Sequence, residues 1–155
     1  MLTWYLRSVV VILSITAFAK IWSAAGSAKI LTLPDPVLDI QNKVVLILAA
    51  GLEILVIAIA IQARSDFTKL IAVMALALDF VIYRIGLNHM AFGQPCPCLG
   101  TITDRLPFSH RTINGVLEAT ICYFIVGSML FIGRELVLRK DGAVGQLLRG
   151  TKARG

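Results

Sequence analysis

The fold of this chain is decided first by residues Val44–Ile61, which read VVLILAAGLEILVIAIAI. Glu53 is the only charged residue in this stretch, whose length is close to the roughly 20 residues that a helix needs to cross a bilayer core. Three further long apolar segments share this character, and they cover residues 4–24, 67–92 and 112–133. The sequence therefore predicts an all-α fold, an integral membrane four-helix bundle.

The composition supports a membrane protein. Of the 155 residues 57% are hydrophobic, whereas soluble domains contain about 45–50% apolar residues. The mean hydropathy is +0.82. A membrane β-barrel is not expected, because the apolar segments are too long for its strands and do not alternate with polar residues. We expect one membrane domain over residues 1–133, followed by a basic tail at 134–155 that is disordered beyond a short helical extension.

The positive charge is concentrated in the C-terminal tail. The net charge is +6, and six of the fifteen Lys and Arg residues follow Phe131. A basic tail beside a membrane segment is an ordinary topology signal and attracts anionic lipid. Elsewhere no Lys/Arg patch is interleaved with aromatic residues, so the lipid bilayer is an expected partner and nucleic acid is not.

Basic residues also predict the orientation. Nine lie on one side, namely Arg7, Arg64, Lys69 and the six of the tail, against four on the other, namely Lys29, Lys43, Arg105 and Arg111. The positive-inside rule then places both termini in the cytoplasm. In a bacterium the protein would lie in the inner membrane, with both long connections facing the periplasm or exterior. Cleavage of the first segment as a signal peptide, near Ala24–Ala28, would leave this orientation unchanged.

Five polar residues lie in the outer half of the predicted segments: Lys20, Glu53, Arg84, Asn88 and Glu118. A charged side chain that faces lipid costs about 2.5–3.5 kcal/mol or more, so these should face the bundle interior. Helical rise puts Glu53 and Arg84 at the same depth, roughly 12–14 Å from the outer end, and predicts that they pair. Lys20 and Glu118 would extend the network. It either fixes helix packing or supports the chemistry of the connection above it.

Two more features concern the helix interfaces. Thr16, Gly51 and Gly127 are expected at contacts between helices, where small residues allow close approach. Asp79 lies deeper than the other charges and shares a helix face with Tyr83, but the sequence names no partner for it.

The candidate reactive site is Gln94–Gly100, which reads QPCPCLG. Thiol–disulfide exchange needs one thiolate that attacks and a second thiol that resolves the mixed disulfide. Cys96 and Cys98 are close in sequence and lie in a polar connection. Pro97 biases Cys96 toward an extended backbone, so a disulfide between the two would be strained and labile. The sequence predicts Cys96 and Cys98 as the catalytic pair, with Cys96 favoured as the attacking thiol.

Other interpretations of the pair stay open. Soft thiolates also bind Cu(I) or Zn(II), and His89 and Met90 are candidates for further ligands. A structural disulfide and a non-catalytic membrane assembly factor are further alternatives. Cys122 lies in the middle of the fourth segment, where a small apolar role is expected.

Together these residues resemble the methylamine-utilisation MauE family, within a wider DoxX-like group of redox-associated membrane proteins. The likeness extends to about Ile132 and rests on these positions: Lys20, Glu53, Arg84, Cys96, Cys98 and Gly100. Leu99 departs from the family, which commonly has Phe there, and the prolines around Cys96 are less typical.

The resemblance implies a membrane bundle that supports disulfide formation or electron transfer to exported proteins. The implied activity is that of a thiol–disulfide oxidoreductase, and the namesake role is maturation of methylamine dehydrogenase. The implied partner is a periplasmic thioredoxin-like protein or an exported client protein. The residues identify no cofactor with certainty, and a quinone is left open.

Overall fold

The computed structural model describes residues 1–26, 29–35, 37–90 and 110–152. Over these ranges the chain is helical and contains no strand. The elements are α1 (Leu2–Ala25), the short 3-10 helix η1 (Lys29–Thr32), α2 (Asn42–Gln62), α3 (Asp66–Met90) and α5 (His110–Lys152).

Four helices are long and apolar enough to cross a membrane. They are α1, α2, α3 and the Gly115–Val137 part of α5. Many of their large apolar side chains are exposed, among them Ile15, Leu55 and Leu130, as is expected of surfaces that face lipid tails. These features indicate a multi-pass membrane protein and confirm the predicted all-α fold.

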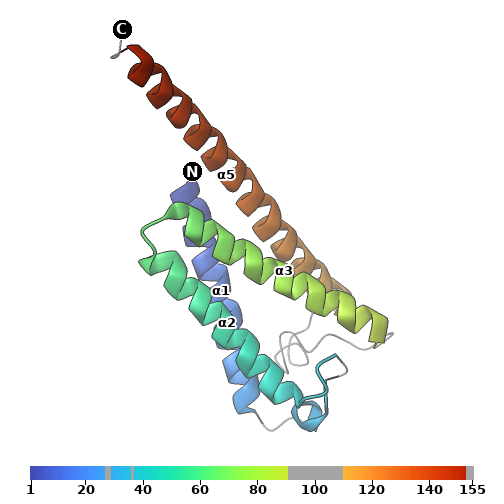
Figure 1. Ribbon diagram of the computed structural model, residues 1–155. Coiled ribbons are helices and arrows are strands. Elements are labelled where there is room, and N and C mark those ends of the chain that lie inside the picture. Colours follow the sequence, from blue (N-terminus) through green and yellow to red (C-terminus); the bar gives the residue numbers. More distant parts are fainter. Residues whose placement is uncertain (27–28, 36, 91–109, 153–155) are drawn as a thin grey trace.

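The C-terminal tail differs from the prediction. We expected disorder soon after residue 133, but α5 continues as one helix to Lys152 (Figure 1). An established helix propagates easily, because each added residue gains a hydrogen bond without a new nucleation cost. The prediction of a disordered tail was therefore wrong for the backbone up to Lys152.

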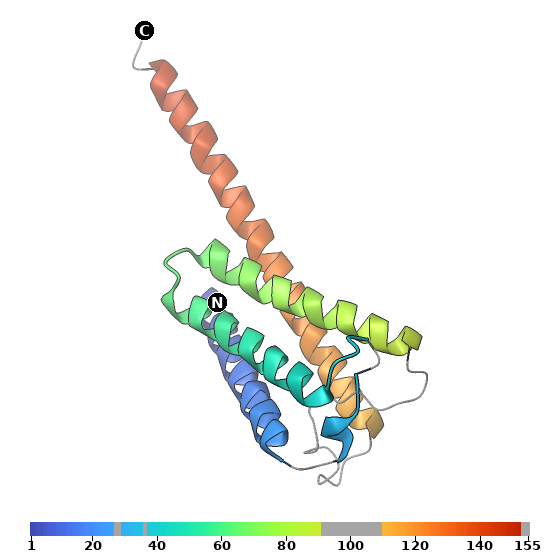
Figure 2. The same cartoon turned by 60° about the horizontal axis from the view of Figure 1, so that its bottom comes forward.

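The four long helices run alternately up and down. α1 packs mainly against α2, and α3 mainly against α5. The start of α1 and the far end of α5 lie toward the same end of the bundle (Figure 1). We call the opposite end, where α1 and α3 finish and α2 and α5 begin, the loop end. α2 and α3 diverge toward it from the short turn at residues 63–65 (Figures 1 and 2).

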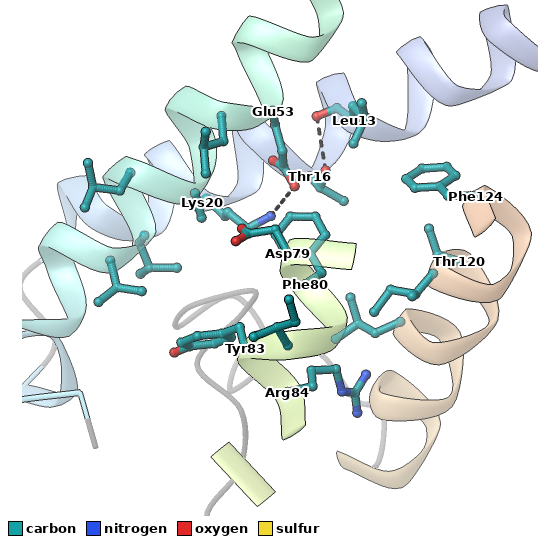
Figure 3. Close-up of a pocket in the computed structure, with 18 of the residues that line it drawn as sticks. Leu13, Thr16, Lys20, Glu53, Asp79, Phe80, Tyr83, Arg84, Thr120 and Phe124 are labelled. Carbon is teal, nitrogen blue, oxygen red and sulfur yellow. Dashed lines mark hydrogen bonds and ion pairs between the residues drawn. The ribbon is translucent and has the colours of Figure 1, made fainter. Parts of the chain in front are cut away.

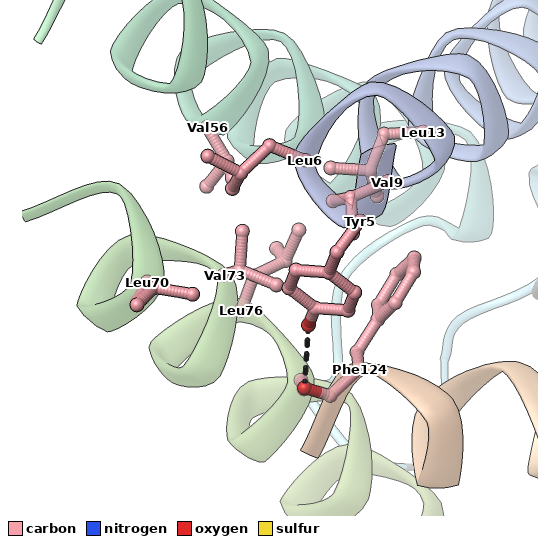
Figure 4. Packing of buried hydrophobic residues seen from close by; sticks show 10 residues of the cluster. Tyr5, Leu6, Val9, Leu13, Val56, Leu70, Val73, Leu76 and Phe124 are labelled. Carbon is pink, nitrogen blue, oxygen red and sulfur yellow. Dashed lines mark hydrogen bonds between the residues drawn. The ribbon is translucent and has the colours of Figure 1, made fainter. Parts of the chain in front are cut away.

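The apolar core lies in the half of the bundle away from the loop end. Its buried members come from all four helices (Figure 4): Tyr5, Leu6, Val9, Leu13, Val56, Leu70, Val73, Leu76, Ala77 and Phe124. The Tyr5 hydroxyl donates to the Phe124 carbonyl at 2.9 Å and shares a second 2.9 Å hydrogen bond with Ser128. The core thus joins α1 to α5 by both packing and hydrogen bonding.

Gly127 lets α1 and α5 approach closely, as predicted. A Cβ atom at this position would overlap the Tyr5 ring. Gly51 differs, because a Cβ there would meet none of the described residues within 4 Å. The expected contact at Gly51 was therefore wrong, and the close approach between helices belongs to Gly127.

We predict that Gly127→Ala destabilises the protein. The added methyl must displace a ring that is packed and hydrogen-bonded, and overpacking of this kind costs about 1–3 kcal/mol. The measurement is thermal unfolding in detergent, followed by circular dichroism. Gly133→Ala is the matched control in the same helix, because its new Cβ meets no atom within 4 Å in the part of the chain that the structure describes. An equal melting temperature for both variants would contradict the prediction.

Candidate functional site

A cavity of about 360 Å³ lies between the helices in the half of the bundle near the loop end (Figure 3). α1, α2, α3, α5 and residues 37–38 all contribute to its lining. The lining is mainly apolar, with these polar side chains among it: Thr16, Lys20, Asn42, Glu53, Asp79, Tyr83, Arg84 and Thr120. Three residues of the predicted polar network, Lys20, Glu53 and Arg84, therefore share one cavity.

A buried ion pair joins α1 to α2 at this cavity. Lys20 Nζ lies 2.5 Å from Glu53 Oε1, and the side chains are only 6% and 1% exposed. Lys20 Nζ also lies 5.3 Å from the centre of the Phe80 ring on α3. Either charge alone at this depth would be strongly unfavourable, so each residue requires the other.

The second carboxylate oxygen of Glu53 has no such partner. Glu53 Oε2 is buried and accepts no hydrogen bond from the residues that the structure describes. The Thr16 hydroxyl, which donates to the Leu13 carbonyl at 3.1 Å, also interacts with the Glu53 carboxylate. Glu53 therefore binds Lys20 through one oxygen and keeps the other buried inside the protein.

A second ion pair joins α3 to α5. Arg84 Nη2 lies 3.1 Å from Glu118 Oε1, and Glu118 is 67% exposed. The predicted Glu53–Arg84 pair was therefore wrong: Glu53 pairs with Lys20, and Arg84 pairs with Glu118. Helical rise estimates depth along the bundle but not which helices are neighbours, and α1 packs on α2 while α3 packs on α5.

The remaining polar residues of α3 divide between the cavity and the surface. Asp79 lines the cavity together with the buried ion pair but is itself exposed (Figure 3). Asn88 is exposed and lies outside the lining of the cavity, although we expected it in the polar network. Its position one turn beyond Arg84 places it on the same face but past the end of the cavity.

A loop that the sequence analysis did not single out closes one side of the cavity. We call it the Asp35 loop, residues 33–35 and 37–41. Asp35 is 1% exposed, and its Oδ1 accepts hydrogen bonds from the backbone N–H groups of Val37 at 2.9 Å and Leu38 at 3.1 Å. Its Oδ2 accepts a 2.5 Å hydrogen bond from the Tyr83 hydroxyl on α3. Val37 also packs against Gly86, where a Cβ would lie 3.1 Å from its side chain.

The sequence does contain a signal for this loop. Leu33-Pro34-Asp35-Pro36 places an aspartate between two prolines. In a turn, an aspartate side chain often accepts a hydrogen bond from the backbone N–H two residues further on. This pattern does not identify the partner of Asp35 on α3, because Tyr83 is 48 residues away in the sequence.

The predicted catalytic pair, Cys96 and Cys98, lies outside the described residues. The helix ends that flank it, Met90 and His110, are both at the loop end (Figure 1). Cys122 is exposed on α5 rather than buried in the core. Among the described ranges, no group of three or more His, Cys, Asp or Glu side chains is arranged to hold a metal ion.

Comparison with known proteins adds no family assignment. No protein-family model, no curated protein and no solved structure matches this chain. The class that the fold and the cavity define is thus a multi-pass helical membrane protein with a buried ion pair. The resemblance to the MauE family stays a prediction.

We predict that substitutions of Lys20 and Glu53 have strongly non-additive effects on the free energy of unfolding. Lys20→Met or Glu53→Leu alone leaves an unpaired charge in an apolar interior, which costs about 3–5 kcal/mol. The double variant removes both charges and should be more stable than either single variant. Thermal unfolding of the four proteins in one detergent gives the coupling free energy. The prediction would be contradicted if the effects of the two single variants on the free energy of unfolding added up to the effect of the double variant.

We also predict that Tyr83→Phe loosens the Asp35 loop. Loss of a hydrogen bond to a buried carboxylate costs about 1.5–3 kcal/mol, so the Val37 and Leu38 amides should exchange at least tenfold faster with deuterium. Hydrogen–deuterium exchange in detergent measures this. Tyr123→Phe is the control, because the Tyr123 hydroxyl bonds Ser8 instead of the loop. Unchanged exchange in Tyr83→Phe would refute the role of this contact.

Proposed function

We propose that the protein performs thiol–disulfide exchange with exported proteins at the outer face of a bacterial inner membrane, using Cys96 and Cys98. The observation that carries the proposal is the ion pair between Arg84 and Glu118. These residues lie on the two helices that lead into and out of the cysteine-bearing segment. The pair therefore joins these two helices near the ends from which that segment extends.

The exchange needs no oxidant or reductant other than the two proteins, because one disulfide breaks for each disulfide that forms. The Cys96 thiolate attacks the disulfide of a thioredoxin-like partner, which breaks that bond and forms a mixed disulfide. Cys98 then attacks the Cys96 sulfur, and the partner leaves as a dithiol while a Cys96–Cys98 disulfide forms. The reverse sequence transfers a disulfide to an exported client. The labile character expected of a Cys-x-Cys disulfide suits both directions.

The orientation and the client are part of the proposal. The excess of Lys and Arg at the termini and in the turn at residues 63–65 supports cytoplasmic termini and an outward-facing cysteine segment. The resemblance to the MauE family makes methylamine dehydrogenase the first client to test. Lys20, Glu53 and Arg84 would then support the reactive segment from the bundle beneath it.

The first test is thiol trapping of the purified protein. We expect alkylation by a mass tag at one cysteine before reduction and at all three after it, since the chain has three cysteines. Cys98→Ser should accumulate a mixed disulfide between Cys96 and a thioredoxin with a single active-site cysteine, supplied as its mixed disulfide with 5-thio-2-nitrobenzoate, because this leaving group departs and no second thiol resolves the new bond. Cys122→Ser is the control and should leave both the disulfide and its re-formation intact.

The same preparation distinguishes the metal alternative. Copper or zinc at one ion per chain, lost in Cys98→Ser, would refute the redox proposal and favour a soft-metal site. Unimpaired maturation of the client after replacement of both Cys96 and Cys98 by Ser would instead show that the pair has no catalytic role.

A further inference from the structure

The cavity near the loop end has the size and the walls of a site for a small molecule. Its volume of about 360 Å³ falls within the range of about 300–1,000 Å³ that is typical of ligand pockets. The walls are mostly aliphatic or aromatic, with Leu13, Val45, Leu46 and Phe124 among them. Walls of this kind favour a ligand with an apolar body.

The cavity opens toward the bilayer between α2 and α3. Leu48 and Leu52 of α2 and Ile82 of α3 line it and are also 55%, 43% and 69% exposed. They lie on the two helices that diverge toward the loop end (Figure 1). Because all three belong to segments that are long and apolar enough to span a membrane, a molecule dissolved in the bilayer has a direct route into the cavity.

Asp79 lies at this opening. It lines the cavity, is exposed, and precedes Ile82 by three residues, which places both on one face of α3. The Asp79 carboxylate forms no hydrogen bond or ion pair with any residue that the structure describes. A charged side chain without a partner in the middle of a spanning helix is costly. A bound group of opposite charge at the opening would remove this cost.

The other charged side chains at the cavity already have partners. Lys20 binds Glu53, and Arg84 binds Glu118. Each of these two pairs is neutral, so Asp79 gives the described part of the site one unbalanced negative charge. The charge of the site therefore favours a ligand with one positive charge.

Two aromatic rings favour an organic cation over a metal ion. Phe80 follows Asp79 in the sequence and Tyr83 lies one turn further along α3, and both rings line the cavity (Figure 3). The faces of such rings attract ammonium groups. A metal ion needs several ligands, and the described ranges contain no group of three or more His, Cys, Asp or Glu side chains arranged to hold one.

We propose that this cavity binds a singly charged organic cation from the bilayer, an ammonium compound with an apolar body. The ammonium group lies against the Asp79 carboxylate at the opening, and the apolar body extends between α2, α3 and α5. Binding neutralises the unbalanced charge of Asp79 and leaves both ion pairs intact. It is independent of the thiol–disulfide exchange proposed above.

The test compares two probes that have the same shape and differ in charge. The full chain in nanodiscs of phosphatidylcholine, a lipid without net charge, is titrated with tritiated octyltrimethylammonium, and binding to empty nanodiscs is subtracted. We expect saturable binding of about one probe per chain. Unlabelled 2,2-dimethyldecane, in which carbon replaces the charged nitrogen, should compete at least tenfold more weakly, because the attraction to a carboxylate is lost.

Two variants with matched controls locate the probe. Asp79→Asn keeps the size of the side chain but removes its charge, and should weaken binding at least tenfold. Asp66→Asn makes the same change on α3 outside the cavity, where Asp66 pairs with Lys69, and should leave binding unchanged. Ala49→Phe fills the cavity from α2 and should abolish saturable binding, whereas Ala75→Phe, at an exposed position outside the cavity, should not.

The native chain alone decides the question if Asp79→Asn or Ala49→Phe fails to fold. Octyltrimethylammonium should then protect the native protein against thermal unfolding more strongly than 2,2-dimethyldecane does. Equal protection by the two probes would overturn the proposal.

Three further outcomes would also overturn it: no saturable binding above empty nanodiscs, equal competition by both probes, or native binding in folded Asp79→Asn or Ala49→Phe. The variant with Cys96→Ser and Cys98→Ser should bind octyltrimethylammonium as the native chain does. Loss of exchange activity with retained probe binding therefore separates failure of one proposal from failure of the other.

Discussion

The ion pair between Lys20 and Glu53 is the constraint on which the loop-end half of the bundle depends. Both side chains are almost fully buried between α1 and α2, in segments long and apolar enough to span a bilayer. Lipid offers no solvation to either charge, so the two helices must keep the register that holds the atoms in contact. The aromatic and aliphatic core near Tyr5 stabilises the other half, where Gly127 allows α5 to approach α1.

Two further polar contacts hold together the elements around the cavity. The Asp35 loop precedes α2 in the chain and is bound to α3 through Tyr83, while Arg84 binds α5 through Glu118. Tyr83 and Arg84 are adjacent in the sequence, so one turn of α3 contacts both the loop and α5. This turn therefore links the cavity wall to the helix ends that flank Cys96 and Cys98.

Much of the fold could be predicted because membrane segments follow from local sequence. The predicted segments agree with the helices to within a few residues, apart from the extension of α5 to Lys152. The predicted set of buried charges also contained Lys20 and Glu53. The predicted pairing of Glu53 with Arg84 was wrong because residue counting gives only the depth along a helix. Which helix lies next to it depends on packing. For the same reason the sequence did not reveal the bond from Tyr83 to Asp35.

By itself the sequence determined that four apolar helices form, because a bilayer penalises backbone N–H and C=O groups that lack hydrogen bonds. It also determined that several charged side chains must be buried among these helices, because a charge that faces lipid is costly. Its basic residues predict an orientation, and its Cys-x-Cys predicts a redox site. Only the tertiary structure decided that Glu53 binds Lys20, that Arg84 binds Glu118, and that the second oxygen of Glu53 is buried. These features depend on how the helices rotate and diverge, which no local pattern encodes.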